Sequence, residues 1–389
     1  MRRRVLVAAL AILVAAGAFA SRGFLRGLSF VIRAADVHGV ARRAADIGAT
    51  AIAEHGLSIP TPRGQLRARL YEPGRGHQRA ALLVSGLHPA GIDEPRLVAL
   101  ARELAASGLA VVTPDIPELS RFDITPAITT SIVASGVWLA DASGLAPDHR
   151  AALMGVSFSG GLAVVAAGRP ELRGRVAYVF SFGGHDDLPR VLRYLCSGQE
   201  PAPPARGGDL RSGPAPPHDY GVAVILLGLA DRVVPPNQVE PLRTAVRRFL
   251  WASHLDRVDP LQAKREFEAL RELARSMPEP SATLLGLVNA RDVASLGPRL
   301  LPYIDQYGDA GMLSPSRASK PSAPVFLLHG TDDNVVPAAE SVFLARDLDG
   351  HAPVRLLLSD LISHAEADRP MKVRDVVALA NFWGDLLGR

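Results

Sequence analysis

The sequence of 389 residues has very little of several features that would otherwise decide its class. It holds one cysteine, Cys196, so no disulfide can form within the chain, and this cysteine is expected to be buried or to lie in a cap. Only three residues are lysine, and 5% are aromatic. One long uncharged apolar run occurs, from Val5 to Ala20. These shortages exclude a disulfide-stapled small protein and a polytopic membrane protein.

Nucleotide and metal motifs are also missing from the sequence. It contains no glycine-rich phosphate loop, no dinucleotide fingerprint, and no H-E-x-x-H or Cys/His cluster with metal-site spacing. We therefore expect no cofactor and no metal. Apolar residues make up 48% of the chain and charged residues 21%, which argues against wholesale disorder.

The formal net charge of +4 is unevenly distributed along the chain. Residues 1–43 contain eight arginines and a single acidic residue, whereas acidic residues outnumber basic ones in the remainder. A mildly acidic body does not favour binding to nucleic acid, so no nucleic-acid partner is expected.

Residues 1–33 have the pattern of a signal or membrane anchor. Three arginines precede the apolar run, and Ala18-Phe19-Ala20 matches a signal-cleavage site. Arg22 and Arg26 follow at once and apolar residues then resume, which favours an uncleaved, slightly short anchor. A buried helix is the third alternative. An anchor or a signal would each bring the amino terminus to a membrane. The body would then be membrane-anchored outside the cytoplasm, or secreted or periplasmic.

The remaining chain alternates short apolar strands with helices, apart from one interruption. Residues 34–59 are expected to form a connecting helix, and residues 65–72 a half-buried edge strand. Segments 60–186 and 321–389 show strand–helix alternation, while 187–320 is richer in amphipathic helices. The fold class predicted is α/β, with a mostly parallel sheet covered on both faces and a helical cap inserted at 187–320.

The strongest chemical signal is the turn Gly155-Val-Ser157-Phe-Ser159-Gly-Gly. It lies between a predicted strand and a predicted helix, where a sharp turn exposes a serine hydroxyl at the carboxyl edge of the sheet. Small residues two positions before and after the serine permit this turn. The second small residue is usually glycine, so Ser159 departs from the common pattern.

A serine nucleophile needs a general base that is oriented by an acid. Asp333 follows the predicted strand at 325–329, and His364 follows the one at 354–358, so both should lie at the same sheet edge as Ser157. Asp231 is an alternative acid, since Leu227-Gly-Leu-Ala-Asp231-Arg-Val-Val-Pro resembles the Asp333 loop.

The chain resembles the α/β-hydrolase superfamily in G-V-S-F-S-G-G, H-G-T-D-D-N-V-V-P and S-H-A-E, taken in that order. This resemblance implies that Ser157 is the nucleophile, His364 the base and Asp333 the orienting acid. It also implies an oxyanion hole formed by the N–H of Phe158 and a second N–H, from Leu87 or His88.

The resemblance implies a serine hydrolase that cleaves carboxylic esters or related acyl bonds of small molecules through an acyl-enzyme. An acyltransferase and a catalytically silent, membrane-tethered binding protein are the alternatives. His88 and His185 follow predicted strands and are possible pocket residues, although either could be a hydrogen-bonded loop histidine. The substrate and the oligomeric state cannot be read from the sequence.

Overall fold

The computed structural model describes residues 22–77, 79–201, 216–308, 311–362 and 372–389. At its centre lies an eight-stranded sheet in the order β1-β2-β4-β3-β5-β6-β7-β8. The strands are β1 (Ile52–Thr61), β2 (Gly64–Pro73), β3 (Arg79–Val84), β4 (Leu109–Pro114), β5 (Ala151–Val156), β6 (Val176–Phe182), β7 (Val325–Gly330) and β8 (Val354–Ser359). β2 runs antiparallel to both of its neighbours, and the pairs from β4 to β8 are parallel.

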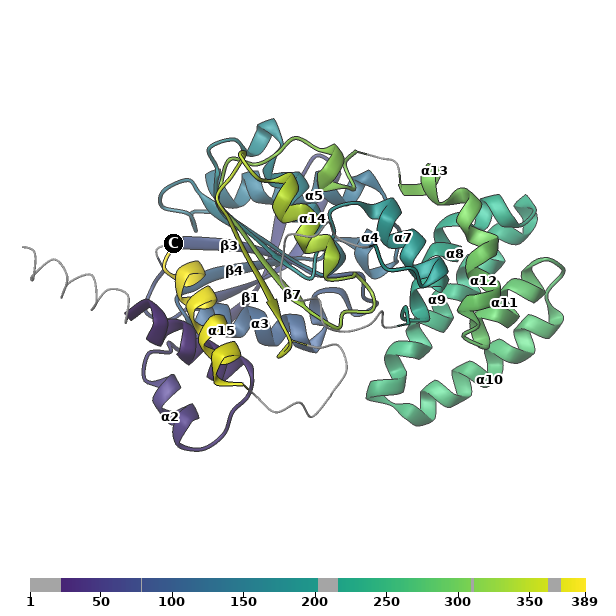
Figure 1. Ribbon diagram of the computed structural model, residues 1–389, viewed down its shortest axis with the longest axis horizontal. Helices are drawn as coiled ribbons and strands as arrows, with labels where there is room; N and C mark the ends of the chain where they lie inside the picture. The colour runs from purple at the N-terminus through teal and green to yellow at the C-terminus, as the bar shows by residue number, and fades with distance from the viewer. Residues whose placement is uncertain (1–21, 78, 202–215, 309–310, 363–371) are drawn as a thin grey trace, which may run out of the picture.

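Helices cover both faces of this sheet (Figure 1). One face packs against α5 (Pro126–Asp141), α6 (Phe158–Ala167) and α14 (Ala339–Asp347). The other face packs against α3 (Pro95–Ala106) and α15 (Val373–Leu387). The apolar side chains of β3 alternate between the two cores, as the pleat of a strand requires. This is the α/β-hydrolase fold, so the predicted fold class is confirmed.

The segment between β6 and β7 is helical wherever the structure describes regular elements in it. It holds α7 (Leu188–Ser197), α8 (Tyr220–Val233), α9 (Pro236–Val258), α10 (Pro260–Ser276), α11 (Ser281–Asn289), α12 (Val293–Leu300), α13 (Ile304–Gly308) and the short helices η3 (Leu301–Tyr303) and η4 (Pro315–Arg317). Helices α8 to α12 stand beyond one end of the sheet and form a cap (Figure 1). Cys196 lies buried in α7. Burial raises the pKa of its thiol to about 12.

The prediction of a single connecting helix at 34–59 is wrong. The chain forms only a short helix there, α2 (Val40–Asp46), and then enters β1. The tight turn before Gly64 pairs β1 with β2 along its whole length. This hairpin adds a strand outside β2, so β2 is not the edge strand that we predicted.

Residues 22–34 form a helix that packs on the folded body. Its small residues pack closely on α15. The approach is so close that a Cβ at Gly27 would overlap the carbonyl oxygen of Ala380. Phe30 is buried, with its ring centroid 4.1 Å from that of Trp383. Residues 1–21 of the predicted 1–33 segment lie outside the described residues, so the anchor or signal stays a prediction. Among the residues described, no helix is both long and apolar enough to cross a bilayer.

Candidate active site

The candidate site lies where the order of the strands reverses. From β3 the chain passes through α3 on one face to β4, and from β5 it passes through α6 on the other face to β6. Connections that diverge in this way leave a crevice beyond the carboxyl ends of neighbouring strands. Leu87 follows β3 and Ser157 follows β5, so both residues face this crevice.

Ser157 occupies a strained turn between β5 and α6. Its backbone has φ 54° and ψ −129°, in a region that non-glycine residues rarely adopt. Its N–H donates to the carbonyl of Phe182, with an N···O distance of 2.6 Å. A Cβ at Gly155 would overlap the carbonyl oxygen of Ser159. The turn therefore has three features of a nucleophile elbow. It follows a strand, its backbone is strained, and small residues pack around the serine.

Ser159, the departure from the common motif, has a structural explanation. Its side chain is fully buried, and its hydroxyl donates to the carbonyl oxygen of Ser85 at 2.6 Å. Ser85 is the residue after β3 and lies two positions before Leu87. The extra hydroxyl thus ties the serine turn to the loop that is expected to supply an oxyanion donor. Sequence reasoning noted this position only as a tolerated substitution.

The loop after β3 approaches Ser157 closely. A Cβ at Gly86 would lie 3.2 Å from the Cβ of Ser157 and 3.8 Å from its Oγ. Leu87 and Phe158 line the same cavity as Ser157. The two residues proposed to supply oxyanion N–H groups therefore lie on the two segments that border the serine.

His88 follows Leu87 in this loop but is not among the residues that line the cavity. Its Nδ1 accepts from the N–H of Ala90, and its ring packs edge-on against that of His254 in α9, with centroids 4.8 Å apart. Burial lowers the pKa of His88 to about 4, so the ring is neutral near pH 7.

Asp333 is held in the loop after β7. Its Oδ1 accepts the N–H groups of Val335 and Val336, at 2.9 and 3.0 Å. A Cβ built at Gly183 would lie 3.4 Å from Oδ2 of Asp333 and 4.0 Å from the Cα of Ser157. The carboxylate and the serine therefore flank the same glycine, whose φ of 64° favours a residue without a side chain.

His364, the predicted base, lies outside the described residues. The strand that leads to it, β8, pairs in parallel with β7, and Gly330 is opposite Ser359. The segment beyond Ser359 therefore starts at the same sheet edge as the Asp333 loop. The alternative acid, Asp231, lies on α8 in the cap, where it pairs with the surface residue Arg243.

The cavity at Ser157 is walled by the core on one side, and by α7 and the cap helix α8 on the other. Leu188, Leu192 and Leu195 come from α7, and Val224 and Ile225 come from α8. The other lining residues are Leu87, Ile124, Ser157, Phe158, Val191, Tyr220, Gly221, Val335 and Val336. Apart from the Ser157 and Tyr220 hydroxyls, these side chains are apolar. Burial raises the pKa of Tyr220, which therefore stays protonated.

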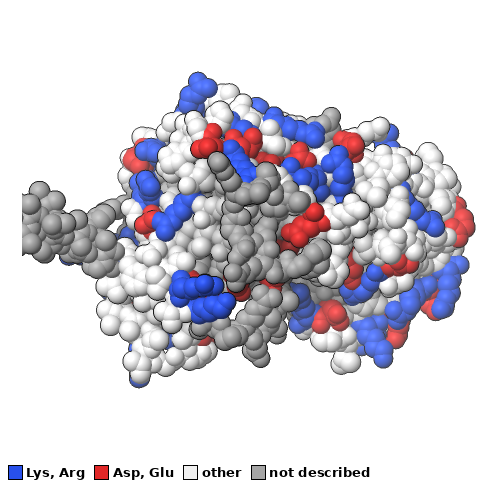
Figure 2. All heavy atoms as spheres, viewed as in Figure 1, with Lys and Arg blue, Asp and Glu red and all other residues white. Residues whose placement is uncertain are grey.

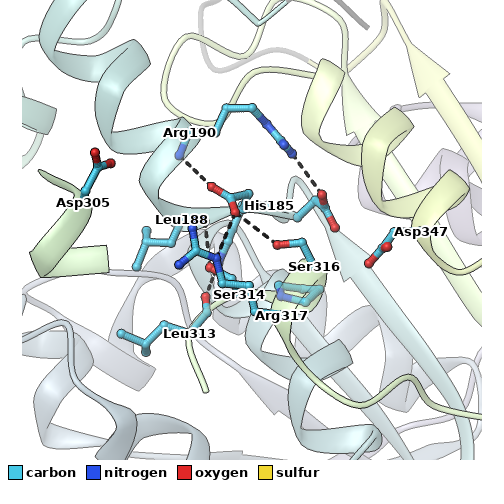
Figure 3. Close-up of polar contacts among 12 residues, drawn as sticks. His185, Leu188, Arg190, Asp305, Leu313, Ser314, Ser316, Arg317 and Asp347 are labelled. Carbon is cyan, nitrogen blue, oxygen red and sulfur yellow. Dashed lines mark hydrogen bonds and ion pairs between the residues drawn. The ribbon is translucent and has the colours of Figure 1, made fainter. Parts of the chain in front are cut away.

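His185 lies behind this cavity rather than among its lining residues. Its ring stacks on that of Phe158, with centroids 5.2 Å apart, and its Nε2 lies 2.7 Å from the carbonyl of Leu313. Burial lowers its pKa, so the ring is neutral and supports Phe158 from behind. Figure 3 shows His185 beside Leu313 in a polar cluster that also holds Ser316 and Arg317.

This cluster fixes the loop after β6. Asp187 caps α7 by accepting from the N–H of Arg190, and it also accepts from the hydroxyl of Ser316. Figure 3 shows Leu188 beside Ser314, whose Oγ accepts the Leu188 N–H at 2.9 Å. The loop that carries Gly183 and His185 is thereby tied to the chain that returns from the cap.

Glu340, in α14, joins this cluster to the segment that follows Asp333. Its side chain is fully buried, and Oε2 accepts the N–H groups of Asp186 and Asp187, at 2.9 and 3.0 Å. The carboxylate also pairs with Arg190. Sequence reasoning missed Glu340, because a glutamate in an amphipathic helix gives no sign that it is buried.

Comparison with known proteins gives only distant likenesses. No family model and no curated protein matches the sequence. The chain is similar to an esterase from Pyrobaculum calidifontis at 16% identity, covering 87% of this chain and 83% of that one, with a TM-score of 0.42. It is similar at 15% identity to a thermostable carboxylesterase cloned from a metagenomic library, covering 94% and 95%, with a TM-score of 0.47.

A third solved structure is the dienelactone hydrolase from Anabaena variabilis. It is 16% identical, the match covers 86% of this chain and 96% of that one, and the TM-score is 0.40. Likenesses this distant assign no activity to the chain, so the reaction is inferred from the site itself.

Proposed function

We propose that the protein is a serine hydrolase that cleaves carboxylic esters, or related acyl bonds, through an acyl-enzyme. The observation that carries this proposal is the strained backbone of Ser157 at the reversal of strand order, opening on an apolar cavity. Strain of this kind persists where the surrounding structure holds a reactive group in place.

In the proposed reaction, Ser157 Oγ attacks the acyl carbon while His364 takes its proton. Asp333 orients the imidazole and stabilises its positive charge. The N–H groups of Phe158 and Leu87 donate to the oxyanion, and His364 then protonates the leaving alcohol. Water activated by His364 finally attacks the acyl-enzyme, which releases the carboxylic acid and restores the Ser157 hydroxyl.

Another histidine, His329, lies near Asp333, with its Nε2 3.5 Å from Oδ2. His364 is nevertheless proposed as the base, because both ring nitrogens of His329 already have hydrogen-bond partners. The Nε2 of His329 lies 2.8 Å from the carbonyl oxygen of Val336 and therefore carries the proton. Its Nδ1 then accepts from the hydroxyl of Ser341, at 2.7 Å. A ring with both nitrogens engaged and no exposed surface cannot take a proton from Ser157.

The cavity lining supports an ester whose acyl or alcohol part is apolar. Side chains from α7 and α8 form one wall, so the cap would contact the chain of the substrate directly. Burying each methylene of that chain stabilises the complex by about 0.8 kcal/mol. A panel of p-nitrophenyl esters of increasing acyl length should therefore show kcat/KM rising until the cavity is filled.

A fluorophosphonate probe tests the nucleophile. Wild-type protein should become covalently labelled, and Ser157→Ala should not. Ser253→Ala on α9 is a matched control that removes a serine hydroxyl from the cap and should label like wild type. Labelling of the Ser157→Ala protein would refute the assignment. Failure of folded wild-type protein to label would favour a catalytically silent binding protein, and ester products formed with added alcohols would identify acyl transfer.

We also propose that residues 1–20 direct the body across a membrane, either as an anchor or as a cleaved signal. The three arginines before an uncharged run support this proposal. Protease added to cells whose outer envelope alone has been permeabilised should digest the body. Protection of the body from the protease would contradict the proposal.

A further inference from the structure

The surface near the amino terminus exposes several large apolar side chains. Val40 is 73% exposed and Ile47 is 80% exposed, at the two ends of α2. Leu25 of helix 22–34 is 58% exposed, and Val373 and Val377 of α15 are 79% and 40% exposed. We call these five residues the amino-terminal apolar face. Large apolar side chains that stay exposed on neighbouring helices suggest an external partner.

The three helices that carry this face form one packed unit. Helix 22–34 crosses α15 at Gly27 and Phe30, which contact Ala380 and Trp383. Arg33, which is buried near the end of that helix, donates to the carbonyl oxygen of Ala45 in α2. Figure 1 shows helix 22–34, α2 and α15 side by side at one end of the molecule.

Basic residues accompany the apolar ones. Arg22 and Arg26 of helix 22–34 and Arg43 of α2 are exposed. Arg33 is buried and pairs with Glu103, and Arg42 pairs with Asp36 and Asp46. In Figure 2 the surface at the lower left, where α2 lies, is mostly uncharged, with blue side chains around it and little red. An apolar surface bordered by basic groups suits a bilayer that contains anionic lipids.

The sequence directly before this face also favours a bilayer over a protein partner. Residues 5–20 are uncharged and largely apolar, and they end immediately before the described helix begins. We propose that the amino-terminal apolar face docks on an anionic bilayer surface. The proposal does not depend on the hydrolase assignment, because the face shares no residue with the proposed catalytic site.

A second exposed apolar group lies on the cap and provides the control. Leu261, at the start of α10, is 73% exposed, the same fraction as Val40. It follows the turn at Asp259, next to Asp256 and Arg257 at the end of α9. This turn has exposed apolar surface without a local excess of basic charge.

The experiment places a reporter on each surface of the full-length chain. Val40→Cys and Leu261→Cys are labelled with an environment-sensitive fluorophore, and unsubstituted protein reports background labelling of the buried Cys196. Each protein is mixed with vesicles of phosphatidylcholine and phosphatidylglycerol that carry a doxyl quencher in their acyl chains. We expect quenching at position 40 to exceed that at position 261 at least about threefold, and to weaken in vesicles of phosphatidylcholine alone.

Equal quenching at the two positions, or quenching at 261 alone, would overturn the proposal. So would vesicle binding with no quenching at 40, which would mean that residues 1–21 alone hold the protein to lipid. Absence of any vesicle binding would overturn it as well and would favour a protein partner. The Val40→Glu and Ile47→Glu double variant supplies a second readout. It should lose most of the quenching of a label at position 25, introduced as Leu25→Cys, while fluorophosphonate labelling of Ser157 stays unchanged.

Discussion

Ser157 and Asp333 lie on opposite sides of Gly183, yet the fold positions them by different means. The serine turn is fixed by close packing of small residues. Gly155 fits only because it has no Cβ, and the tight turn forces Ser157 into positive φ. The Asp333 loop is fixed by polar contacts, namely the two N–H groups that its carboxylate accepts and the buried carboxylate of Glu340 in the helix that follows.

The serine side and the Asp333 side should therefore respond differently to substitution. A sterically fixed turn is insensitive to protonation but tolerates no added atom. A loop held by carboxylates tolerates changes in volume better, yet it depends on charge and on complete hydrogen bonding. Substitutions on the two sides should therefore separate into effects of volume and effects of charge.

The largest effect should follow from removing the charge that is proposed to orient the base. Asp333→Asn is expected to lower kcat about 10³- to 10⁴-fold with little change in fold, because the amide cannot stabilise the imidazolium of His364. Asp332→Asn, one position away, is the control and should lose less than about threefold. A larger loss for Asp332→Asn than for Asp333→Asn, measured by steady-state hydrolysis, would reassign the acid.

On the serine side, the largest expected effect comes from one added methyl group. Gly155→Ala would place a carbon against the carbonyl oxygen of Ser159, so the backbone must shift, at a cost of about 3 kcal/mol or more. Gly286→Ala in α11 is the control, since a Cβ there meets nothing within 4 Å and alanine favours a helix. Denaturant unfolding should show a large loss for the first variant and a small gain for the second. Equal stabilities would contradict steric fixation of the turn.

The sequence was informative about the serine side because steric requirements limit the choice of residue. A small residue at 155, a serine at 157 and glycines at 160 and 161 are visible in the chain itself. The alternation of strands and helices and the α/β fold followed from apolar periodicity. The edge hairpin was missed because β1 is largely exposed, so its apolar pattern is weak and resembles that of a helix.

The polar side was much less predictable. Nothing in the sequence around Glu340 distinguishes a buried glutamate from a solvated one, and its partners Asp186 and Arg190 lie about 150 residues away. The glycines that pack helix 22–34 on α15 were equally hidden within an apolar stretch. Long-range pairing of this kind depends on the tertiary fold, which local patterns do not report.

A smaller effect, on the polar side, should follow from Glu340→Gln. The amide keeps the volume of the side chain but weakens the bonds to Arg190 and to the N–H groups of Asp186 and Asp187, at an expected cost of about 2 kcal/mol in unfolding free energy. Glu240→Gln on α9 is the control, because this glutamate is exposed and its pair with Arg243 should contribute at most about 0.5 kcal/mol. Equal losses in the two variants would show that Glu340 does not hold the loop.

The smallest effect should be one of pH, at Asp186. Burial raises the pKa of this carboxyl from its ordinary 3.8 to about 6, so the ionised form is less favourable in the folded chain than in the unfolded one. The stability associated with its protonation is therefore fully present below about pH 4 and is lost as the pH rises through about 6. Asp186→Asn, which stays neutral, should match wild type near pH 4 and become more stable than wild type as the pH rises through about 6. Urea unfolding of both proteins across this range measures the difference, with exposed Asp349→Asn as the control. A difference that does not change with pH would show that Asp186 is not the titrating group, and the polar side would then be fixed without any dependence on its protonation.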